Sequence, residues 1–542
     1  MQESIFDVLY PKYKITKPIR LIEFFAGYGS QALALKYLGV PFEHWKICEW
    51  AVKSIQAYKD IHFSKGGWEY VCVDIPDYDY AEYLFKKGIS QNYNEPMTLE
   101  QIKRLGKEKQ KEIIANIQIT NNLVNIQQVK GKDLEIVDTD KYDYIMTYSF
   151  PCQDLSLAGK GKGMSDTSTR SGMLWEVERI LGECQELGTL PQILLMENVP
   201  QIHGKKNIDD FNKWIKSLES MGYKNYWQDL IATDYGIPQT RKRTFMVSIL
   251  GDYTYEFPKP IPLELKLKDM LEDNVDEKYY LSDKQIKDVS NWNAYQKPLD
   301  NMEKVDKENI SPTLTTRSGA YAARMVLIKN ATKQGYLEAT EGDGVDISSR
   351  MQYHRGNVQK DMIQTLDTQG GNSKGVVVNM KNELCNKLIQ DGLVEEGDVV
   401  KHSYTTQIMN GNKKCVEKND GNMITLTTRG DCVGVCVKPK VIGGIGEKDS
   451  NNGTQWKQQN RIYDENCAIT VTTCCNSYYK NDLRIRKLTP KECFRLMGVK
   501  DEDFENCAKN QSDASLYHLA GDSIVVNVLM AIFGELLKKE GE

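Results

Sequence analysis

Short apolar runs that alternate with helical segments over the first 250 residues constrain the fold most strongly. Residues 19–25 (IRLIEFF) form a buried-strand pattern that ends just before a glycine-rich turn. Residues 30–39 (SQALALKYLG) follow with helical spacing and a glycine at a C-cap position. Strands that alternate with helices predict a doubly wound α/β fold with a largely parallel sheet. Further strand patterns occur at 44–50, 70–75, 142–150 and 192–199.

Two segments depart from this alternation. Residues 76–140 are polar and contain a predicted helix, capped by Thr98 and running to about residue 117, so we expect an insertion on the surface. From about residue 258 onward, strand-like pieces rich in glycine and asparagine predict a smaller, mainly β domain. The expected division is an α/β domain over residues 1–257, a β domain over 258–500, and a C-terminal segment, 501–542, that returns to the first domain.

A degenerate Thr-Leu-x-Thr pattern recurs within the predicted β domain. Thr-rich runs favour strands, and the small residues that follow each copy favour turns. Two interpretations remain open: a stack of β-hairpins with a structural role only, or units that present loops to a partner's groove. The copies are SPTLTTR at 311–317, IQTLDTQ at 363–369, MITLTTR at 423–429 and AITVTTC at 468–474.

Targeting signals and cysteine usage indicate a reducing compartment. The N-terminus, MQESIFDVLYPKYK, has no basic segment followed by an apolar run, and no stretch of about 18 apolar residues occurs, so we expect neither a signal peptide nor a membrane span. The 13 cysteines are irregularly spaced and odd in number, which is typical of reduced thiols. We therefore expect a cytoplasmic protein, in a prokaryotic cytoplasm or nucleoid or in a phage-infected host. No C-x-x-C pair supports a zinc site, and no metal is expected at Cys432, Cys436, Cys467, Cys474 and Cys475.

The net charge of −5 does not decide whether the partner is a nucleic acid. Residues 301–490 carry about +4, and the rest of the chain carries about −9. Because the distribution of charge matters more than its sum, a DNA-binding lobe attached to an acidic lobe is compatible with this balance.

A glycine-rich turn, FFAGYGSQA (24–32), joins the first predicted strand to the first helix. Such a turn lets the backbone approach a nucleotide cofactor closely. Glu49 ends the next strand, where its carboxylate can accept hydrogen bonds from both ribose hydroxyls, and Asp74 ends the third strand, near the position of an adenine amino group. This pattern fits either NAD or S-adenosylmethionine.

The segment SFPCQDLSLAGKGKGMSD (149–166) is the most specific one in the chain. Cys152 follows a proline at the C-terminal end of a predicted strand, which is where open α/β sheets bind ligands. A lone cysteine is more often a small buried hydrophobic residue, but the Gly/Lys-rich stretch after this one is typical of a mobile loop over a polyanion.

The glycine-rich turn and the segment around Cys152 resemble those of the cytosine-5 DNA methyltransferase family, and the family's motifs occur in this chain in the usual order. The resemblance covers roughly residues 19–257 and 484–540. In the final motif Asp522 stands where the family usually has asparagine. The matching motifs are Phe-x-Gly-x-Gly at 25–29, Pro-Cys-Gln at 151–153, Glu-Asn-Val at 197–199, QTRKR at 239–243, RKLTPKECFRLMGV at 486–499 and GDSIVVNV at 521–528.

The resemblance implies a class I S-adenosylmethionine-dependent, Rossmann-like catalytic domain over 1–257 and a target-recognition domain over 258–500. Cys152 would attack carbon 6 of a flipped-out cytosine, because a thiolate adds readily and later leaves. Glu197, kept partly protonated by burial, would act near ring nitrogen 3. Arg241 and Arg243 complete the expected catalytic set, with Arg243 the first choice for the base carbonyl.

The same resemblance implies the binding residues. S-adenosylmethionine would be held by Phe25, Ala26, Gly27, Gly29, Glu49, Trp50, Asp74, Ile75, Leu174, Ser523 and Val525, with Trp50 stacked on adenine. Double-stranded DNA would be contacted by Gln153, Ser156, Lys160, Lys162, Arg170 and Gln239. We expect a monomer, because the family is commonly monomeric.

The same residues leave three alternative functions to compare. An RNA methyltransferase of the same architecture, acting on tRNA, shares the catalytic motifs but has a short recognition region, so the long segment 258–484 favours DNA. An NAD-dependent oxidoreductase leaves Pro-Cys-Gln, Glu-Asn-Val and QTRKR unexplained. A catalytically inactive DNA-binding protein would not need every catalytic residue type. The repeats raise the further hypothesis that several DNA targets are recognised by separate modules.

Overall fold

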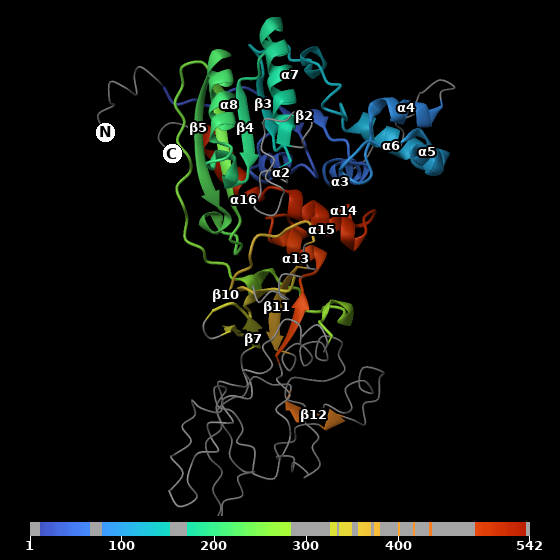
Figure 1. Cartoon of the computed structure of the whole chain (residues 1–542), viewed down its shortest axis with the longest axis vertical. Helices are drawn as coiled ribbons and strands as arrows, with labels where there is room; N and C mark the ends of the chain where they lie inside the picture. Colours follow the sequence, from blue (N-terminus) through green and yellow to red (C-terminus); the bar gives the residue numbers. More distant parts are fainter. Residues whose placement is uncertain are drawn as a thin grey trace, which may run out of the picture. The chain divides into compact units, whose positions relative to one another are not determined.

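The computed structural model divides into two compact units, which are described separately (Figure 1). The first unit comprises Met1–Met270, Met362–Gly371 and Pro490–Glu542, and the second comprises Leu271–Asp361 and Asn372–Thr489. The predicted boundaries at 257 and 500 thus fall at 270 and 489, and the short return of 362–371 to the first unit was not predicted. The structure describes residues 11–64, 79–151, 171–282, 326–332, 335–348, 356–369, 373–379, 399–401, 416–417, 433–435 and 483–537.

A mixed β-sheet forms the centre of the first unit. Its strand order is β2-β1-β3-β4-β6-β5, in which β1 to β4 are mutually parallel and β6 runs antiparallel to both β4 and β5. Every residue of β3 and β4 is buried, as expected for strands covered on both faces. The predicted α/β architecture is confirmed. The strands are β1 (Ile19–Phe24), β2 (Phe42–Cys48), β3 (Asp143–Tyr148), β4 (Ile193–Asn198), β5 (Tyr223–Ile231) and β6 (Lys242–Leu250).

Helices pack on this sheet and bury its apolar side chains. A large core cluster joins β1, β3 and β4 to helices α7 (Leu174–Leu187) and α8 (Ile208–Ser220). Helix α2 (Ser30–Tyr37) begins at Gly29, and Gly39 follows its C-terminus with φ 70°, as the sequence predicted. Helix α3 (Val52–His62) follows β2.

Residues 79–134 lie within the predicted insertion, and they pack against the rest of the first unit. Their helices bury an apolar cluster that includes Ile55 of α3, and the Asn122 side chain bonds both backbone groups of Glu49. Thr98 does cap a helix through a capping box, but Gly106, with φ 76°, divides the predicted single helix into two. The helices are α4 (Tyr80–Lys87), α5 (Leu99–Arg104) and α6 (Lys107–Ile119).

The C-terminal part of the first unit is helical. It consists of α13 (Pro490–Arg495), α14 (Asp501–Ala508), α15 (Asp513–Asp522) and α16 (Val526–Leu537), and α16 packs on α2. The stretch Asp513–Leu537 is long and apolar enough to qualify as a membrane span by composition, which was not expected. It consists of two separate helices, and 67% of its apolar window is buried within the protein, as in a core helix of a globular domain.

The described elements of the second unit are mainly strands. Its largest sheet has the order β10-β9-β11-β15 and is antiparallel, with Val345, Val377 and Ile485 in its core. Further sheets have the orders β13-β12-β14 and β7-β8. The strands are β7 (Val326–Lys329), β8 (Tyr336–Ala339), β9 (Gly344–Asp346), β10 (Val358–Gln359), β11 (Lys374–Asn379), β12 (Val399–Lys401), β13 (Val416–Glu417), β14 (Val433–Val435) and β15 (Leu483–Lys487).

Candidate active site

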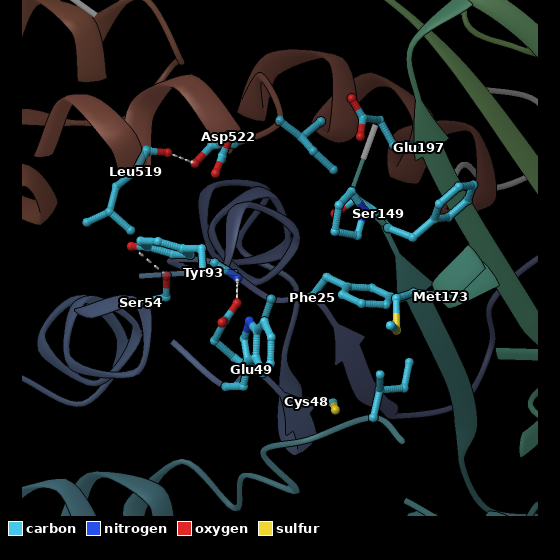
Figure 2. A pocket seen from close by; sticks show the side chains of 18 of the residues that line it. Phe25, Cys48, Glu49, Ser54, Tyr93, Ser149, Met173, Glu197, Leu519 and Asp522 are labelled. Carbon is cyan, nitrogen blue, oxygen red and sulfur yellow. Dashed lines mark hydrogen bonds between the residues drawn. The ribbon is translucent and has the colours of Figure 1, made fainter. Parts of the chain in front are cut away.

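A cavity of about 430 Å³ opens at the carboxyl ends of the parallel strands of the first unit (Figure 2). The turn after β1, the residues after β2 and β3, and the last residues of β4 all reach it. Open α/β sheets bind ligands at this edge, and the volume suits a cofactor-sized molecule. The lining residues that the sequence predicted are Phe25, Ala26, Gly27, Glu49, Trp50, Glu197, Arg241, Arg243 and Ser523.

The two glycines of the first turn have different surroundings. Gly27 (φ 55°) lines the cavity, and a Cβ added there meets no described atom within 4 Å. Gly29 (φ 82°) does not line it: an added Cβ would lie 2.4 Å from His62 Nε2 and 2.6 Å from a ring carbon of Tyr58. Gly27 therefore leaves room for a ligand, whereas Gly29 lets α2 pack closely against α3.

Glu49 lies directly after β2, and its carboxylate accepts hydrogen bonds from the backbone. Gly27 N–H donates to Oε2 at 3.0 Å, and Ala51 N–H donates to Oε1 at 2.8 Å. Burial raises the pKa of Glu49 to about 7, a rise that the two backbone donors oppose and the charge of Asp522 assists. A carboxylate has about four acceptor positions in all, so these backbone bonds leave capacity for a further donor, as the predicted contact with ribose hydroxyls requires.

Glu197 and Arg243 form a buried ion pair at the junction of β4 and β6. Arg243 Nε lies 3.1 Å from Glu197 Oε1, and both side chains are at most 16% exposed. Burial raises the pKa of Glu197 above its ordinary value, while the guanidinium of Arg243 opposes that rise. The direction of this shift is the one that the predicted role of Glu197 as a proton donor requires.

The residues that precede Cys152 reach the same cavity. Ser149, Phe150 and Pro151 line it, and Asn198 donates a hydrogen bond to the carbonyl of Phe150 at 3.0 Å. The Glu-Asn-Val motif therefore fixes the end of β3, two residues before the predicted nucleophile. The predicted residues Asp74, Ile75, Cys152, Gln153, Ser156, Lys160, Lys162 and Arg170 lie outside the described residues.

Arg241 lines the cavity, as expected of a predicted catalytic residue, whereas Gln239 does not. The guanidinium of Arg241 donates hydrogen bonds to the backbone carbonyls of Leu366, Gly521 and Ser523. Gln239, predicted to contact DNA, is fully buried, and its amide donates to the carbonyl of Leu496 at 2.7 Å. Both side chains hold backbone segments together.

Two further predicted cofactor residues do not line the cavity. Leu174 is fully buried in the main core cluster, and the preceding Met173 faces the cavity instead. Val525 is also buried, between Ile524 of the lining and the start of α16. Motif spacing placed both residues next to lining residues, Met173 and Ile524, but could not resolve which side chain faces the cavity.

A further group of lining residues, away from the strand ends, was not predicted from the sequence, and we name it the second wall. The ring of Tyr93, which Figure 2 shows beside Ser54, stacks on His518 of α15 with 4.0 Å between centroids, and Nδ1 of His518 lies 3.2 Å from Asp522. Tyr93 has φ 62°, and its hydroxyl lies 3.4 Å from that of Ser54. Asn125 and Gln127 extend this wall. The departure of Asp522 from the family's asparagine was the one signal that pointed here.

No cluster of three or more potential metal ligands occurs in the parts of the chain that the structure describes. The cysteines considered for zinc, from Cys432 to Cys475, lie outside those parts.

The sheet, the glycine turn and the carboxylate after β2 define a class I S-adenosylmethionine-dependent methyltransferase fold. The model of the C-5 cytosine-specific DNA methylase family matches residues 101–369 and 380–538, which is most of the chain. The chain therefore belongs to this family and is a DNA (cytosine-5-)methyltransferase.

Relatives support the same assignment. The type II methyltransferase M2.ScrFI of Lactococcus lactis subsp. cremoris is 37% identical over 273 residues, which are 50% of this chain and 72% of that protein. The orphan methyltransferase M.SssI of Spiroplasma monobiae is 38% identical over 273 residues, 49% of this chain and 68% of that protein. The orphan methyltransferase M.SPRI of Bacillus phage SPR is 25% identical over 453 residues, 76% of this chain and 87% of that protein. The solved Dnmt2 methyltransferase of S. pombe aligns over 95% of this chain and 98% of its own at 12% identity with a TM-score of 0.44, which adds nothing to the assignment.

Proposed function

We propose that this enzyme methylates carbon 5 of a flipped-out cytosine within a specific sequence of double-stranded DNA, through a covalent bond between Cys152 and the base. The observation that carries this proposal is the buried Glu197–Arg243 pair, which lines the same cavity as Pro151 and the glycine turn. An acid, a guanidinium and the residue next to a cysteine thus converge on one ligand-sized space.

The chemistry assigns each group a step. The thiolate of Cys152 adds to carbon 6 of cytosine, and the electron pair of the broken ring double bond makes carbon 5 nucleophilic. Glu197, in its protonated form, donates toward ring nitrogen 3 and stabilises the negative charge that addition places on the ring. Arg243 holds Glu197 and the base carbonyl. After methylation a base removes the proton from carbon 5, the carbon–sulfur bond breaks, and the thiolate leaves.

The residues of the cavity fit S-adenosylmethionine as the cofactor. Gly27 leaves open space at the lining, Glu49 has acceptor capacity, and Trp50 offers an aromatic face. When bound, this cofactor supplies an electrophilic methyl group. Glu49 would accept from the ribose, and the turn from Phe25 to Gly27 would approach the methionine part with its backbone.

Access to carbon 6 requires the cytosine to leave the helix stack, because none of these groups reaches it in a duplex. Gln153, Ser156, Lys160, Lys162 and Arg170 are proposed to contact DNA on the basis of their sequence position after the nucleophile. Their lysines and arginine would neutralise phosphates, and this contribution weakens with salt.

The Cys152→Ala variant tests the mechanism. We expect it to lose methylation of DNA completely while it still binds DNA, whereas Cys184→Ala, at a buried cysteine of α7, keeps the activity. Methyl transfer by Cys152→Ala at the wild-type rate would contradict the covalent step. Parallel assays with DNA and tRNA as acceptors separate the proposal from the RNA methyltransferase alternative, which requires transfer to tRNA only.

The number of DNA targets is a separate proposal. The recurrence of this degenerate pattern, Thr-Leu-x-Thr in three copies and Thr-Val-x-Thr in the fourth, motivates recognition of several targets by separate modules. Bisulfite sequencing of DNA from cells that express the enzyme should reveal more than one methylated motif, and a single motif would refute the hypothesis.

A further inference from the structure

Residues 362–369 leave the second unit and dock within the first. Ile363 N–H donates to the carbonyl of Pro238, and Thr240 N–H donates to the carbonyl of Ile363, each at 3.0 Å. Leu366 N–H donates to Gln239 Oε1 at 3.1 Å. The side chains of Ile363 and Leu366 are buried, so we name residues 363–368 the docked motif.

Arg241 connects the docked motif to the C-terminal end of α15, which lines the cavity. Its guanidinium donates to the carbonyl of Leu366 at 3.0 Å, of Gly521 at 3.0 Å and of Ser523 at 2.7 Å. These three acceptors come from two segments that are far apart in the sequence. A planar guanidinium with five donors can bond them together, and a lysine ammonium cannot reproduce that geometry.

Gly521 provides the space for the docked motif. A Cβ added to Gly521 would lie 2.3 Å from the carbonyl carbon and oxygen of Asp367 and 2.5 Å from the nitrogen of Thr368. Because these neighbours are backbone atoms, any side chain at 521 would displace the motif. Gly521, Asp522 and Ser523, at the C-terminal end of α15, all line the cavity, so a displacement of the docked motif also changes the cavity lining.

We propose that Arg241 is a positioning residue, which holds the docked motif against residues 521–523 at the C-terminal end of α15, so that docking shapes the methyl-transfer cavity. Arg241 is two residues from Arg243, the partner of Glu197, and both arginines come from one backbone segment. The inference rests on the proposed function. In this proposal Arg241 does not contact the base. It acts indirectly, because it positions both the end of α15 and the neighbouring Arg243.

The docked motif is one of the four copies of the degenerate pattern, and its fit suggests what the site accepts. Most contacts use backbone groups, Leu366 and the hydroxyl of Thr365, which donates to the carbonyl of Thr240 at 3.3 Å. Both polar atoms of Gln364 are buried and find no hydrogen-bond partner among the described residues. The other copies, which lie outside the described residues, carry the apolar Pro312, Ile424 or Ile469 at this position. The site therefore fits the shared pattern better than it fits Gln364.

The contact between the docked motif and the end of α15 is tested by two variants, one on each side of it. Arg241→Ala removes the three donors, and Gly521→Ala pushes the motif away without touching Arg241. We expect each variant to lower kcat by about 100-fold, as a small misplacement of catalytic groups does, with a smaller change in KM. The double variant should be no worse than the worse single one, because both changes break the same connection. Arg241→Lys should not rescue, and Gly534→Ala, where an added Cβ meets no described atom within 4 Å, is the control.

Hydrogen exchange gives a readout that is independent of methylation. The amides of Ile363 and Leu366 should lose protection in both single variants and keep it in Gly534→Ala. Additive losses of kcat, or a loss of activity in Arg241→Ala with protection of these amides intact, would overturn the proposal in favour of direct contact with the base. If the wild type methylated no DNA, the proposed function would fail, while the exchange result would still report on docking.

The inference that the docking site fits the pattern shared by the four copies is tested by changing the docked motif itself. The triple variant Ile363→Met, Gln364→Ile, Asp367→Thr makes the docked motif read MITLTT, as residues 423–428 do. We expect protected amides and a kcat within a few-fold of the wild type. A triple variant that loses protection while Gly534→Ala keeps it would show that the site requires one particular sequence.

Discussion

The two walls of the cavity are built in different ways. The first wall consists of the strand-end residues, among them Gly27, Glu49 and Glu197, and it is held by sheet pairing and buried hydrogen bonds. The second wall consists of Tyr93 and its neighbours from residues 90–127, together with His518 and Asp522 of α15, and it is held by a ring stack and side-chain contacts. Under the proposed function, we propose that the first wall carries the chemistry and that the second wall adjusts how tightly the ligand is held.

Glu197→Gln tests the first wall at its catalytic acid, where we expect the largest effect. The amide is close in size but cannot supply a proton, so kcat should fall by about 100- to 10,000-fold while DNA still binds. Steady-state kinetics measure the loss. Glu186→Gln, at an exposed position of α7, should leave kcat unchanged. Near-normal turnover by Glu197→Gln would contradict the proposal that the first wall supplies the catalytic acid.

The first wall was predictable from sequence because its residues follow strands. Alternating strands and helices locate the carboxyl edge of a parallel sheet, and motif residues at strand ends must meet there, as Gly27, Glu49 and Glu197 do. The second wall was not predictable, since Tyr93 and His518 meet only through packing between segments that are distant in sequence. The same reason explains Arg241 and Gln239, whose acceptors in residues 362–369 no local pattern could indicate.

Gly27 and Gly29 of the first turn test whether protein stability and cofactor binding depend on different positions of the same wall. Gly29→Ala places a Cβ against Tyr58 and His62 and should destabilise the protein by about 2–5 kcal/mol, the sum of overpacking and left-handed strain. Gly27→Ala adds only the strain, about 1–2 kcal/mol, but narrows the cavity. Urea unfolding and S-adenosylhomocysteine titration should therefore show opposite rankings for the two variants. Equal losses of stability would mean that Gly27 is not an open position.

Glu49 makes cofactor binding depend on pH. Burial raises its pKa to about 7, so the side chain is protonated at lower pH and charged above it. Ribose hydroxyls donate hydrogen bonds and favour the charged acceptor, so the affinity for S-adenosylhomocysteine should rise as pH increases through about 7, by up to about tenfold per unit below the pKa. Calorimetric titration of the wild type and Glu49→Gln checks this. The variant should show a weaker and flatter profile, and an unchanged slope would assign the titration to another group.

Tyr93→Ala tests the second wall, where we expect the smallest effect. Losing the stack on His518 should cost about 0.5–1.5 kcal/mol of cofactor affinity, or about two- to tenfold in Kd, because the ring also lines the cavity. Tyr93→Phe keeps the stack and loses only the 3.4 Å contact with Ser54, so it should bind nearly as the wild type does. At saturating cofactor, kcat of Tyr93→Ala should return to normal, since no reacting group contacts this ring in the proposed mechanism. A kcat loss that saturation does not restore would place Tyr93 with the strand-end residues, and the division of labour between the two walls would fail.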